Sequence, residues 1–596
     1  MKTYDKHREL MMLARYHSLP DDILQAFEDT IRHRSKHVPD VGVPAIKPTR
    51  KPGPVLKFGV IDYAVRVQDG VEQTIVTLVT RECTTTLVVR DDEEFNASLH
   101  TLMFPIMKKE YTWFCPDGKD RFIRYFKHSL MKGLAAHGYH VSGTRINSPD
   151  TNLRVSKDNC HWWIADYNAC HQATLSGTSY DATILDNANA DHQTILTRFY
   201  EEICAVQEFY KTELGVSMKR TAASSGMAVF RRHMPDSSCL SRPSPQIFAV
   251  CREGGLLRQG YIQHENYLGL ASEEDQRRQY TSLLADDLPQ HFMLGHAVSG
   301  GQRQKGLFLC RVSGQGMFPI HIGSYSPLRH TFEREYWNGG SVICWLADTE
   351  YEGIERAGYT IDPIFGYVID EWFSVRSLVE KLQMLTDIHD PKSAIGLVLK
   401  LIGNGTIGKF SSQSAFHSYV YSTEDQKGLY PMQEDETGKD IPNVWQKVSK
   451  VFMGYQQPAL AARLYGATRT QLYLRMAEHL EQGRRVVHAC TDGLIVVGSL
   501  GMMHYSNNPR FGQWRLEQNN VPTSITGRNR YVIGTKEKNM GAGSMTLTRE
   551  AIKSITVASP PTEPLKASTI AFLRALGTYT AGISLSTTFV TNPRME

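Results

Sequence analysis

One stretch constrains this chain more than any other, the segment KLIGNGTIGKF at residues 400–410. If a helix runs through it, Lys400, Asn404 and Ile407/Gly408 share one face, because residues three or four apart are neighbours on a helix. A lysine on a helix face suits the negative charge of a triphosphate, and a nearby glycine lets a base or sugar approach the backbone. The stretch therefore predicts a phosphate-binding helix.

Two other interpretations of the same stretch stay open. Gly403 to Lys409 fits the P-loop spacing G-x-x-x-x-G-K, but Phe410 follows where a Ser or Thr would hold Mg²⁺. A purely structural interpretation is a glycine-interrupted turn after a buried apolar helix over residues 395–402. Two distant carboxylates flank the stretch, Asp275 upstream and Asp492 downstream, and with a phosphate-binding helix they suggest metal-assisted phosphoryl or nucleotidyl transfer.

Composition bounds the class of protein. At 596 residues the chain is long enough for several domains, and its 41% hydrophobic and 21% charged residues are typical of a soluble globular protein. The formal charge of +4 is small, so any nucleic-acid contact must come from local patches. Ten cysteines without a CxxC pair indicate reduced thiols, and the polar N-terminus and short apolar runs indicate neither secretion nor a membrane. We expect a cytoplasmic protein, in a host cell if it is viral.

The periodicity predicts several regular elements. Alternating and apolar runs bounded by turn residues predict strands, and apolar residues recurring at helical spacing predict helices. The expected strands cover residues 56–61, 74–80, 84–89, 306–312, 317–321 and 341–347, and the expected helices cover 20–32, 191–211 and 470–482.

The stretch at 400–410 resembles the Lys-…-Asn-Ser-x-Tyr-Gly-Lys-Phe segment of family B DNA polymerases, particularly the protein-primed enzymes of phages with small linear genomes. Five residues fall in register, whereas glycine stands for Ser at 405 and isoleucine for Tyr at 407; the five are Lys400, Asn404, Gly408, Lys409 and Phe410. Further segments that resemble family motifs follow in the family's order along the chain, and together they extend the resemblance over about residues 56–535.

The resemblance implies an α+β fold, a right-hand polymerase with palm, fingers and thumb preceded by an RNase H-like exonuclease-type domain. The expected domains are a basic N-terminal extension (1–54), a degenerate exonuclease-like domain (55–215), a first palm segment (216–289), palm with a terminal-protein-type insertion (290–375), fingers (376–415), a second insertion (416–460), a second palm segment with the catalytic hairpin (461–520) and a thumb (521–596).

The exonuclease-like domain lacks acids that proofreading needs. Asp62 stands at the first acidic position, but Ala64 replaces the usual Glu two residues later and Gly133 replaces the second acid. Asp191 retains the third acid. Since two lone carboxylates do not assemble a normal two-metal site, the sequence predicts a remnant without proofreading activity.

Two segments carry the expected catalytic carboxylates. Asp275 and Tyr280 show the D-x-x-x-x-Y spacing of the first palm segment, although Glu274 immediately before is an alternative ligand. The apolar–Asp-Gly–apolar pattern around Asp492 predicts a hairpin, whose tip in the family carries Asp-Thr-Asp-Ser. In that register Cys490 replaces the first Asp, and Asp492 is the second. The resemblance pairs this second Asp with Asp275 across the metals, so both members of the metal-binding pair are present.

The remaining site residues follow from the resemblance. Nucleotide binding is expected of Tyr280, Lys400 and Asn404, with Lys392 joining them on the triphosphate. DNA contacts are expected from a Gly-Gly segment, a long helix and a closing segment; the residues are Arg252, Gly254, Gly255, Arg469, Arg530 and Tyr531. A simple Gly-Gly turn is the structural alternative for the first of these.

The resulting hypothesis is a template-directed DNA polymerase, with Asp275 and Asp492 holding two Mg²⁺ ions, or Mn²⁺, and Lys400 neutralising the triphosphate. The expected partners are primer–template DNA, dNTPs and a terminal protein that primes synthesis, with no membrane. Two alternatives are a catalytically inactive polymerase-fold protein that binds DNA or acts as a scaffold, and a P-loop NTPase.

Overall fold

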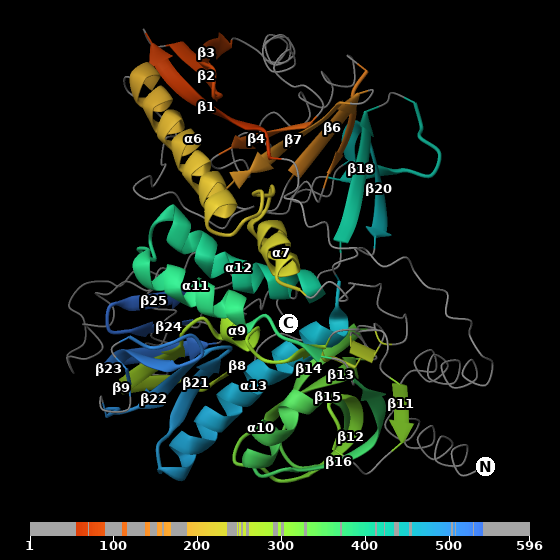
Figure 1. Ribbon diagram of the computed structural model, residues 1–596, viewed down its shortest axis with the longest axis vertical. Helices are drawn as coiled ribbons and strands as arrows, with labels where there is room; N and C mark the ends of the chain where they lie inside the picture. The colour runs from red at the N-terminus through yellow and green to blue at the C-terminus, as the bar shows by residue number, and fades with distance from the viewer. Residues whose placement is uncertain are drawn as a thin grey trace, which may run out of the picture. The chain divides into compact units, whose positions relative to one another are not determined.

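The chain folds into two compact units in this computed structural model (Figure 1). The first unit comprises residues 1–45, 243–376 and 457–596, and the second comprises 46–242 and 377–456. The structure describes residues 55–68, 71–89, 110–115, 138–143, 152–157, 160–167, 188–234, 247, 250–251, 254–257, 262–289, 296–299, 303–326, 331–369, 372–411, 414–421, 424–433, 440–451, 456–501, 505–506, 508–527 and 530–539. The expected N-terminal extension and its helix at 20–32 lie outside these residues.

The first unit is built on an antiparallel sheet. Its described strands follow the spatial order β25-β24-β23-β9-β22-β21-β8. Their bounds are β8 Ile262–His264, β9 Tyr267–Gln276, β21 Val486–Cys490, β22 Gly493–Val497, β23 Trp514–Gly527, β24 Arg530–Ile533 and β25 Lys536–Asn539. The expected hairpin is confirmed as β21 and β22, and residues 521–539 continue this sheet instead of beginning a separate thumb.

One long helix, α13 (Pro458–Glu481), packs on one face of this sheet (Figure 1). It begins twelve residues before the expected helix at 470, with Pro458 in the first turn, where a missing N–H costs nothing. Leu472 and Met476 of the helix pack with Leu494 of β22 in one core cluster. A smaller cluster on the opposite face contains Ala271, Val487, Ile495, Ile525, Tyr531 and Ile533.

A second sheet shares this core. Its described strands follow the order β11-β16-β12-β15, and a hairpin of β13 and β14 and the short helix α10 pack nearby. The bounds are α9 Gln279–Leu283, β10 Leu288–Pro289, β11 His296–Ser299, β12 Gly306–Gly314, β13 Ile320–Ser326, β14 Thr331–Trp337, β15 Gly340–Ala347, η3 Asp348–Glu350, α10 Tyr351–Arg356, β16 Thr360–Val368 and β17 Trp372–Phe373. The strands expected at 306–312 and 341–347 are confirmed, and the one expected at 317–321 begins at Ile320.

The second unit contains a mixed sheet with the order β19-β20-β18-β5-β6-β7-β4-β1-β2-β3. Its bounds are β1 Phe58–Gln68, β2 Val71–Val79, β3 Thr84–Val89, β4 Glu110–Cys115, β5 His140–Gly143, β6 Asn152–Lys157, β7 Cys160–Asp166, β18 Ser414–Tyr421, β19 Tyr430–Gln433 and β20 Asp440–Val451. β1, β4 and β7 run parallel while β1, β2 and β3 are antiparallel neighbours, which is the RNase H-like arrangement.

Helices of the second unit are α6 (Ala188–Thr212), α7 (Ala222–Arg232), α11 (Arg376–Ile388) and α12 (Ala394–Ser411). α6 packs on β1, β2 and β3, where Tyr200 meets Phe58 at a ring separation of 5.3 Å. α7 packs on α12 and belongs to the second unit. The first segment of this unit ends at residue 242, whereas a domain boundary was expected near 215. In the described part of the chain, no helix is long and apolar enough to span a membrane.

Helix α12 contains the whole 400–410 stretch, which contradicts two of the three interpretations of it. The stretch is neither a strand–loop–helix nor a turn, so the P-loop and the glycine-interrupted turn are both wrong. Two glycines instead permit close helix packing. A β-carbon on Gly405 would lie 2.7 Å from the Cα of Ala223, and one on Gly226 of α7 would lie 2.7 Å from the carbonyl oxygen of Ile402.

This packing predicts opposite effects of two alanine substitutions in one helix. Gly405→Ala should lower the free energy of unfolding, because backbone of α7 occupies the space of the new methyl group. Gly408→Ala meets nothing within 4 Å and should raise stability by about 1 kcal/mol through helix propensity alone. Urea unfolding of both variants checks the pair, and equal effects would contradict the packing role.

Candidate active site

Folding brings Asp275 and Asp492 to the same end of the first unit's sheet. Asp275 lies near the end of β9, and Asp492 lies in the turn between β21 and β22. Asp275 is the register partner of Gly493, and the N–H of Gln276 donates to the carbonyl oxygen of Asp492 at 2.7 Å. A β-carbon on Gly493 would lie 3.6 Å from Oδ1 of Asp275, in ordinary van der Waals contact, so the carboxylate lies directly beside this glycine.

The turn that carries Asp492 has an unusual backbone. Cys490 and Gly493 pair across a tight hairpin, and Thr491 between them has a φ of 57°. A β-branched residue in the left-handed region is strained. Strain of this kind persists where surrounding structure fixes it, and it is frequent at functional sites.

Thr491→Gly should therefore stabilise the fold by about 1 kcal/mol, since glycine enters the left-handed region without a clash. Thermal unfolding measures this gain. Asn520 on β23 is the matched control, with a φ of 51°. Asparagine tolerates that conformation, so Asn520→Gly should give a smaller gain. Equal gains in both variants would show that Thr491 stores no additional strain.

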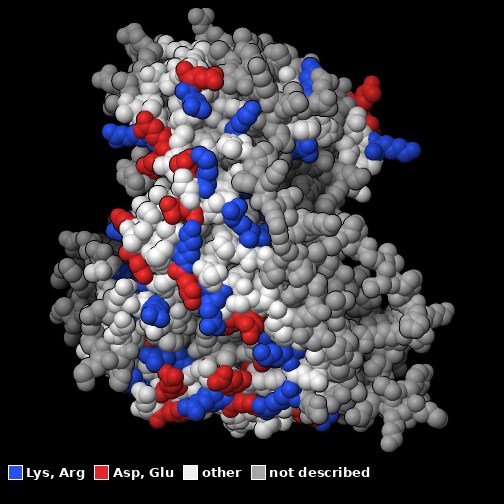
Figure 2. All heavy atoms as spheres, in the orientation of Figure 1, with Lys and Arg blue, Asp and Glu red and all other residues white. Residues whose placement is uncertain are grey.

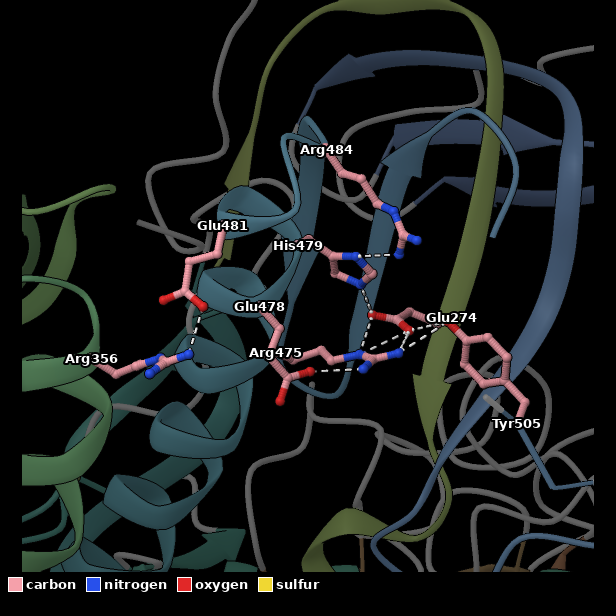
Figure 3. Close-up of polar contacts among 8 residues, drawn as sticks. All are labelled: Glu274, Arg356, Arg475, Glu478, His479, Glu481, Arg484 and Tyr505. Atoms are coloured by element: carbon pink, nitrogen blue, oxygen red, sulfur yellow. Dashed lines mark hydrogen bonds and ion pairs between the residues drawn. The ribbon is translucent and has the colours of Figure 1, made fainter. Parts of the chain in front are cut away.

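On the face of β9 that points toward α13, Glu274 lies in a buried network of charged side chains (Figure 3). Glu274 has 0% exposure and accepts hydrogen bonds from Arg475 and Tyr505, at 2.6 and 2.7 Å. His479 Nε2 lies 2.7 Å from its other oxygen, while Arg484 approaches His479 Nδ1 at 3.3 Å. This arrangement fits an imidazole that donates from Nε2 and accepts at Nδ1.

These contacts settle the choice between Glu274 and Asp275 as the exposed carboxylate. Burial alone would raise the pKa of Glu274, but hydrogen bonds from His479 and Arg475 and the charge of Arg475 lower it to about 2. Successive side chains of a strand point to opposite faces. Asp275 therefore faces away from α13, with 24% of its side chain exposed.

A second buried acid explains how β9 forms without an apolar sequence. Glu273 accepts hydrogen bonds from Lys536 at 2.6 Å and from the Tyr531 hydroxyl at 3.1 Å. Tyr531 is 4% exposed and packs in the core cluster on this face. This placement differs from the expected primer contact, because the Tyr531 hydroxyl is engaged inside the protein. Arg530 lies beside it on β24 and is half-buried.

Tyr280 lies close to the carboxylate pair. It belongs to α9, one turn after β9, and its ring stands edge-on to Tyr465 at a centroid distance of 6.2 Å. Burial raises the pKa of its hydroxyl above the ordinary value, and the charges of Tyr465 and Asp492 raise it further. The hydroxyl is therefore neutral, and the ring is placed where a bulky group can limit the space beside Asp492.

An arginine that we had not predicted contacts Asp275. Arg515 of β23 is the register partner of Asp275, and its Nη2 donates to Oδ2 at 2.9 Å. Burial raises the pKa of Asp275, an effect that the hydrogen bond and charge of Arg515 only partly offset. No local pattern reveals this contact, because it depends on the register of two strands that lie far apart in sequence.

The candidate metal ligands at this end of the sheet are carboxylates. Among the described residues, no group of three or more His, Cys, Asp and Glu side chains is arranged to hold a metal ion. Mg²⁺ keeps several waters and binds proteins through one or two carboxylates plus substrate phosphates. Asp275 and Asp492 would supply two carboxylates of that kind.

Three of the four expected nucleotide-binding residues, all except Tyr280, lie in the second unit. Lys400 and Asn404 are exposed on one face of α12, together with the half-buried Gly408, whereas Ile407 is buried. Lys392 lies in the turn before the helix, not on it, and its N–H donates to Oδ1 of Asp390 at 2.8 Å. Its side chain is exposed.

The Gly-Gly segment is packed inside the first unit. Gly255 has a φ of 76°, and a β-carbon on it would lie 2.4 Å from the Cα of Gly323 in β13. A β-carbon on Gly254 would lie 2.3 Å from the carbonyl oxygen of Val250. Close packing of protein backbone therefore accounts for both glycines without DNA. Arg252 lies outside the described residues.

Arg469 is buried, unlike the phosphate-contacting residue that we had expected. Its Nε donates to Oε1 of Glu350 at 2.8 Å, and both side chains are 2% exposed. A neighbouring pair joins Arg463 to Asp348 at 2.7 Å. Both pairs attach α13 to the segment that follows β15. Arg469 therefore has a structural partner in place of a nucleic-acid phosphate.

The exonuclease-type acids are only partly described. Asp62 lies in β1 with 2% exposure. Asp191 falls in the first turn of α6, and Gly133 lies outside the described residues. Ala64 is also in β1, because this strand continues to Gln68 and does not end at residue 61 as the sequence predicted.

Comparison with known proteins adds evidence for the fold. The sequence matches no protein-family model and no curated protein. The structure is similar to phi29 DNA polymerase complexed with primer-template DNA and incoming nucleotide substrates, with 12% identity, a TM-score of 0.59, and coverage of 85% of this chain and 94% of that chain.

Two further phi29 DNA polymerase structures agree. The post-translocation binary complex with primer-template DNA gives a TM-score of 0.56 at 12% identity, covering 82% of this chain and 90% of that chain. The orthorhombic crystal form gives 0.53 at 13% identity, covering 84% and 94%. The chain therefore has the fold of phi29 DNA polymerase, the polymerase fold that the sequence resemblance predicted.

Proposed function

We propose that this chain is a template-directed DNA polymerase that adds dNMPs to a primer end. The observation that carries the proposal is the placement of Asp275 and Asp492 at one end of the sheet, joined by the 2.7 Å hydrogen bond from Gln276 to the Asp492 carbonyl. The two residues are far apart in sequence, and the pairing of β9 with β22 brings them together.

The roles of the side chains follow from their chemistry. Bound Mg²⁺ would supply charge stabilisation at the attacking and leaving oxygens. Asp275 and Asp492 would hold the ions, and Tyr280 would pack beside the incoming sugar and exclude a 2′-hydroxyl by bulk. Because Cys490 stands where the family has another acid, we expect a weaker metal site than two acids in that turn would give.

Lys400 and Asn404 would bind the nucleotide. Both are exposed on the same face of α12, as a triphosphate-binding helix requires. A lysine there would neutralise the charge that develops on the phosphates in the transition state. Lys392 would add long-range attraction from its turn.

DNA binding would rest on local contacts. On the face shown in Figure 2, the described Lys and Arg side chains are interspersed with Asp and Glu and form no broad basic surface. Phosphate contacts release counterions, so affinity for primer–template DNA should fall steeply with salt.

Two finer parts of the proposal come from the resemblance. Synthesis would start on a hydroxyl of a terminal protein, during replication of a linear viral or plasmid genome. Proofreading would be absent, because Ala64 stands beside Asp62 in β1 where the family has an acid. A 3′–5′ exonuclease activity that disappears in Asp62→Ala would overturn the second part.

Primer extension with labelled dNTPs and Mg²⁺ on a primed single-stranded template tests the main proposal. We expect products whose sequence follows the template. A protein that binds this DNA but never extends it would instead support the inactive scaffold, an alternative consistent with the Arg515–Asp275 contact. Binding is measured on the same DNA by fluorescence anisotropy.

A further inference from the structure

Arg515 contacts two carboxylates at the proposed metal site. Its Nη2 donates to Oδ2 of Asp275 at 2.9 Å, and its Nε lies 2.6 Å from Oε1 of Glu517. Burial lowers the pKa of Arg515, but the hydrogen bond to Asp275 and the charges of Glu517, Asp275 and Asp492 raise it above its ordinary value.

A guanidinium and a divalent cation compete for the same carboxylate oxygens. Mg²⁺ binds hard oxygen ligands, and an arginine binds them with strong charge-assisted hydrogen bonds. Oδ2 of Asp275 is already engaged by Arg515, whereas Oδ1 lies on the side of Gly493. A divalent ion that uses both oxygens of Asp275 would share Oδ2 with the arginine, whose positive charge opposes the ion there.

An exposed ion pair elsewhere in the same sheet provides a comparison for the exposure and surroundings of Arg515. Arg485, just before β21, contacts Glu265 at 2.8 Å, with side chains 62% and 41% exposed. It lies at the end of the hairpin away from the Asp492 turn. Arg515 differs because its partner Asp275 is 24% exposed and other acids lie close by.

We propose that Arg515 is a counter-ion of the active site, which neutralises Asp275 in the metal-free protein and whose positive charge opposes the binding of a divalent ion there. This inference rests on the metal site of the proposed function. Arg515 is then a positioning residue that sets the divalent-ion concentration at which the site fills. Its contact with Glu517 holds the guanidinium beside Asp275.

The test measures Mn²⁺ binding to the full chain without DNA, by the electron paramagnetic resonance signal of free Mn²⁺. Arg515→Gln removes the competing cation, so the dissociation constant of the Asp275-dependent site should fall about tenfold, the worth of one charge-assisted hydrogen bond. Arg485→Gln removes the same charge at the other end of the hairpin and should change the constant less than about twofold. Asp275→Asn should abolish the site.

Arg515→Lys provides a second variant if Arg515→Gln does not fold. Lysine keeps the charge but loses the planar fork, so its Mn²⁺ affinity should lie between wild type and Arg515→Gln. Primer extension against Mg²⁺ concentration should show the same order, with half-maximal rates at lower Mg²⁺ in Arg515→Gln. Unchanged or weaker Mn²⁺ binding in Arg515→Gln, with the Asp275-dependent site present, would overturn the inference.

The result separates this inference from the proposed function. If Arg515→Gln binds Mn²⁺ more tightly but the wild type does not extend a primer, the proposed polymerase activity is refuted and the counter-ion role of Arg515 is retained. Normal primer extension with Mn²⁺ binding that is insensitive to Arg515 would do the reverse. A wild-type protein without an Asp275-dependent Mn²⁺ site would refute both.

Discussion

Replacing Asp275 or Asp492 with asparagine should reduce primer extension by on the order of 10³-fold or more. Asparagine keeps the size of the side chain but removes the negative charge that holds a divalent ion. Because the Asp275 side chain is 24% exposed and Asp492 lies in a turn, the fold should survive both changes. Steady-state extension rates at saturating Mg²⁺, with circular dichroism as the folding check, measure the effect.

The matched control is Asp362→Asn. Asp362 lies on β16 of the same unit, is 67% exposed and contacts only Arg311 at the limit of an ion pair, 4.0 Å, among its described contacts. Its removal should change extension less than twofold. Normal activity in either the Asp275 or the Asp492 variant would refute the proposed site.

Arg469→Ala should lower the free energy of unfolding by about 3–5 kcal/mol, the typical cost of leaving a buried charge without its partner. Glu350 would remain almost fully buried, with only the N–H of Ala347 at 3.0 Å among its described hydrogen-bond donors. Urea unfolding followed by tryptophan fluorescence measures the change. Loss of DNA affinity without loss of stability would instead support the phosphate contact that the sequence predicted.

Two variants make this prediction specific. Arg356→Ala breaks an exposed ion pair between α10 and Glu481 of α13, with side chains 50% and 39% exposed, and should cost less than about 1 kcal/mol. Replacing the whole buried pair, Arg469→Met with Glu350→Leu, removes both charges and should recover most of the stability. Failure of the double variant to recover would show that the pair also specifies the local structure.

Elements coded by local patterns could be predicted from the sequence. The Asp-Gly signal gave the hairpin around Asp492, and β3 has the expected bounds Thr84–Val89. The fold class followed from the order of motifs, of which the 400–410 stretch was the most informative. These signals depend on neighbours in sequence, so one sequence suffices to read them.

Features set by distant partners could not be predicted. β9 carries Glu273 and Glu274 in its buried part because Lys536 and Arg475 compensate them, and both cations are remote in sequence. Arg469 was also misplaced because its partner, Glu350, is distant in sequence. An arginine on a helix looks like a surface residue until the structure reveals a buried glutamate opposite it.

The glycines of the 400–410 stretch were informative for a different reason from the one we expected. We had assigned them to the approach of a base or sugar, whereas Gly405 allows α7 to approach α12. Sequence spacing shows that a side chain is absent without showing which group fills the space. Register and packing partner are therefore the information that one sequence lacks.

The pairing of β18 with β5 has a consequence for engineering this chain. Through that pairing, the segment 414–451 and the exonuclease-type strands share one continuous hydrogen-bonded sheet. Excising 414–451 would leave the backbone groups of β5 unpaired along an open edge, which is a template for self-association. Truncation or grafting of either part should therefore keep the other, and the unit to transplant is the whole sheet.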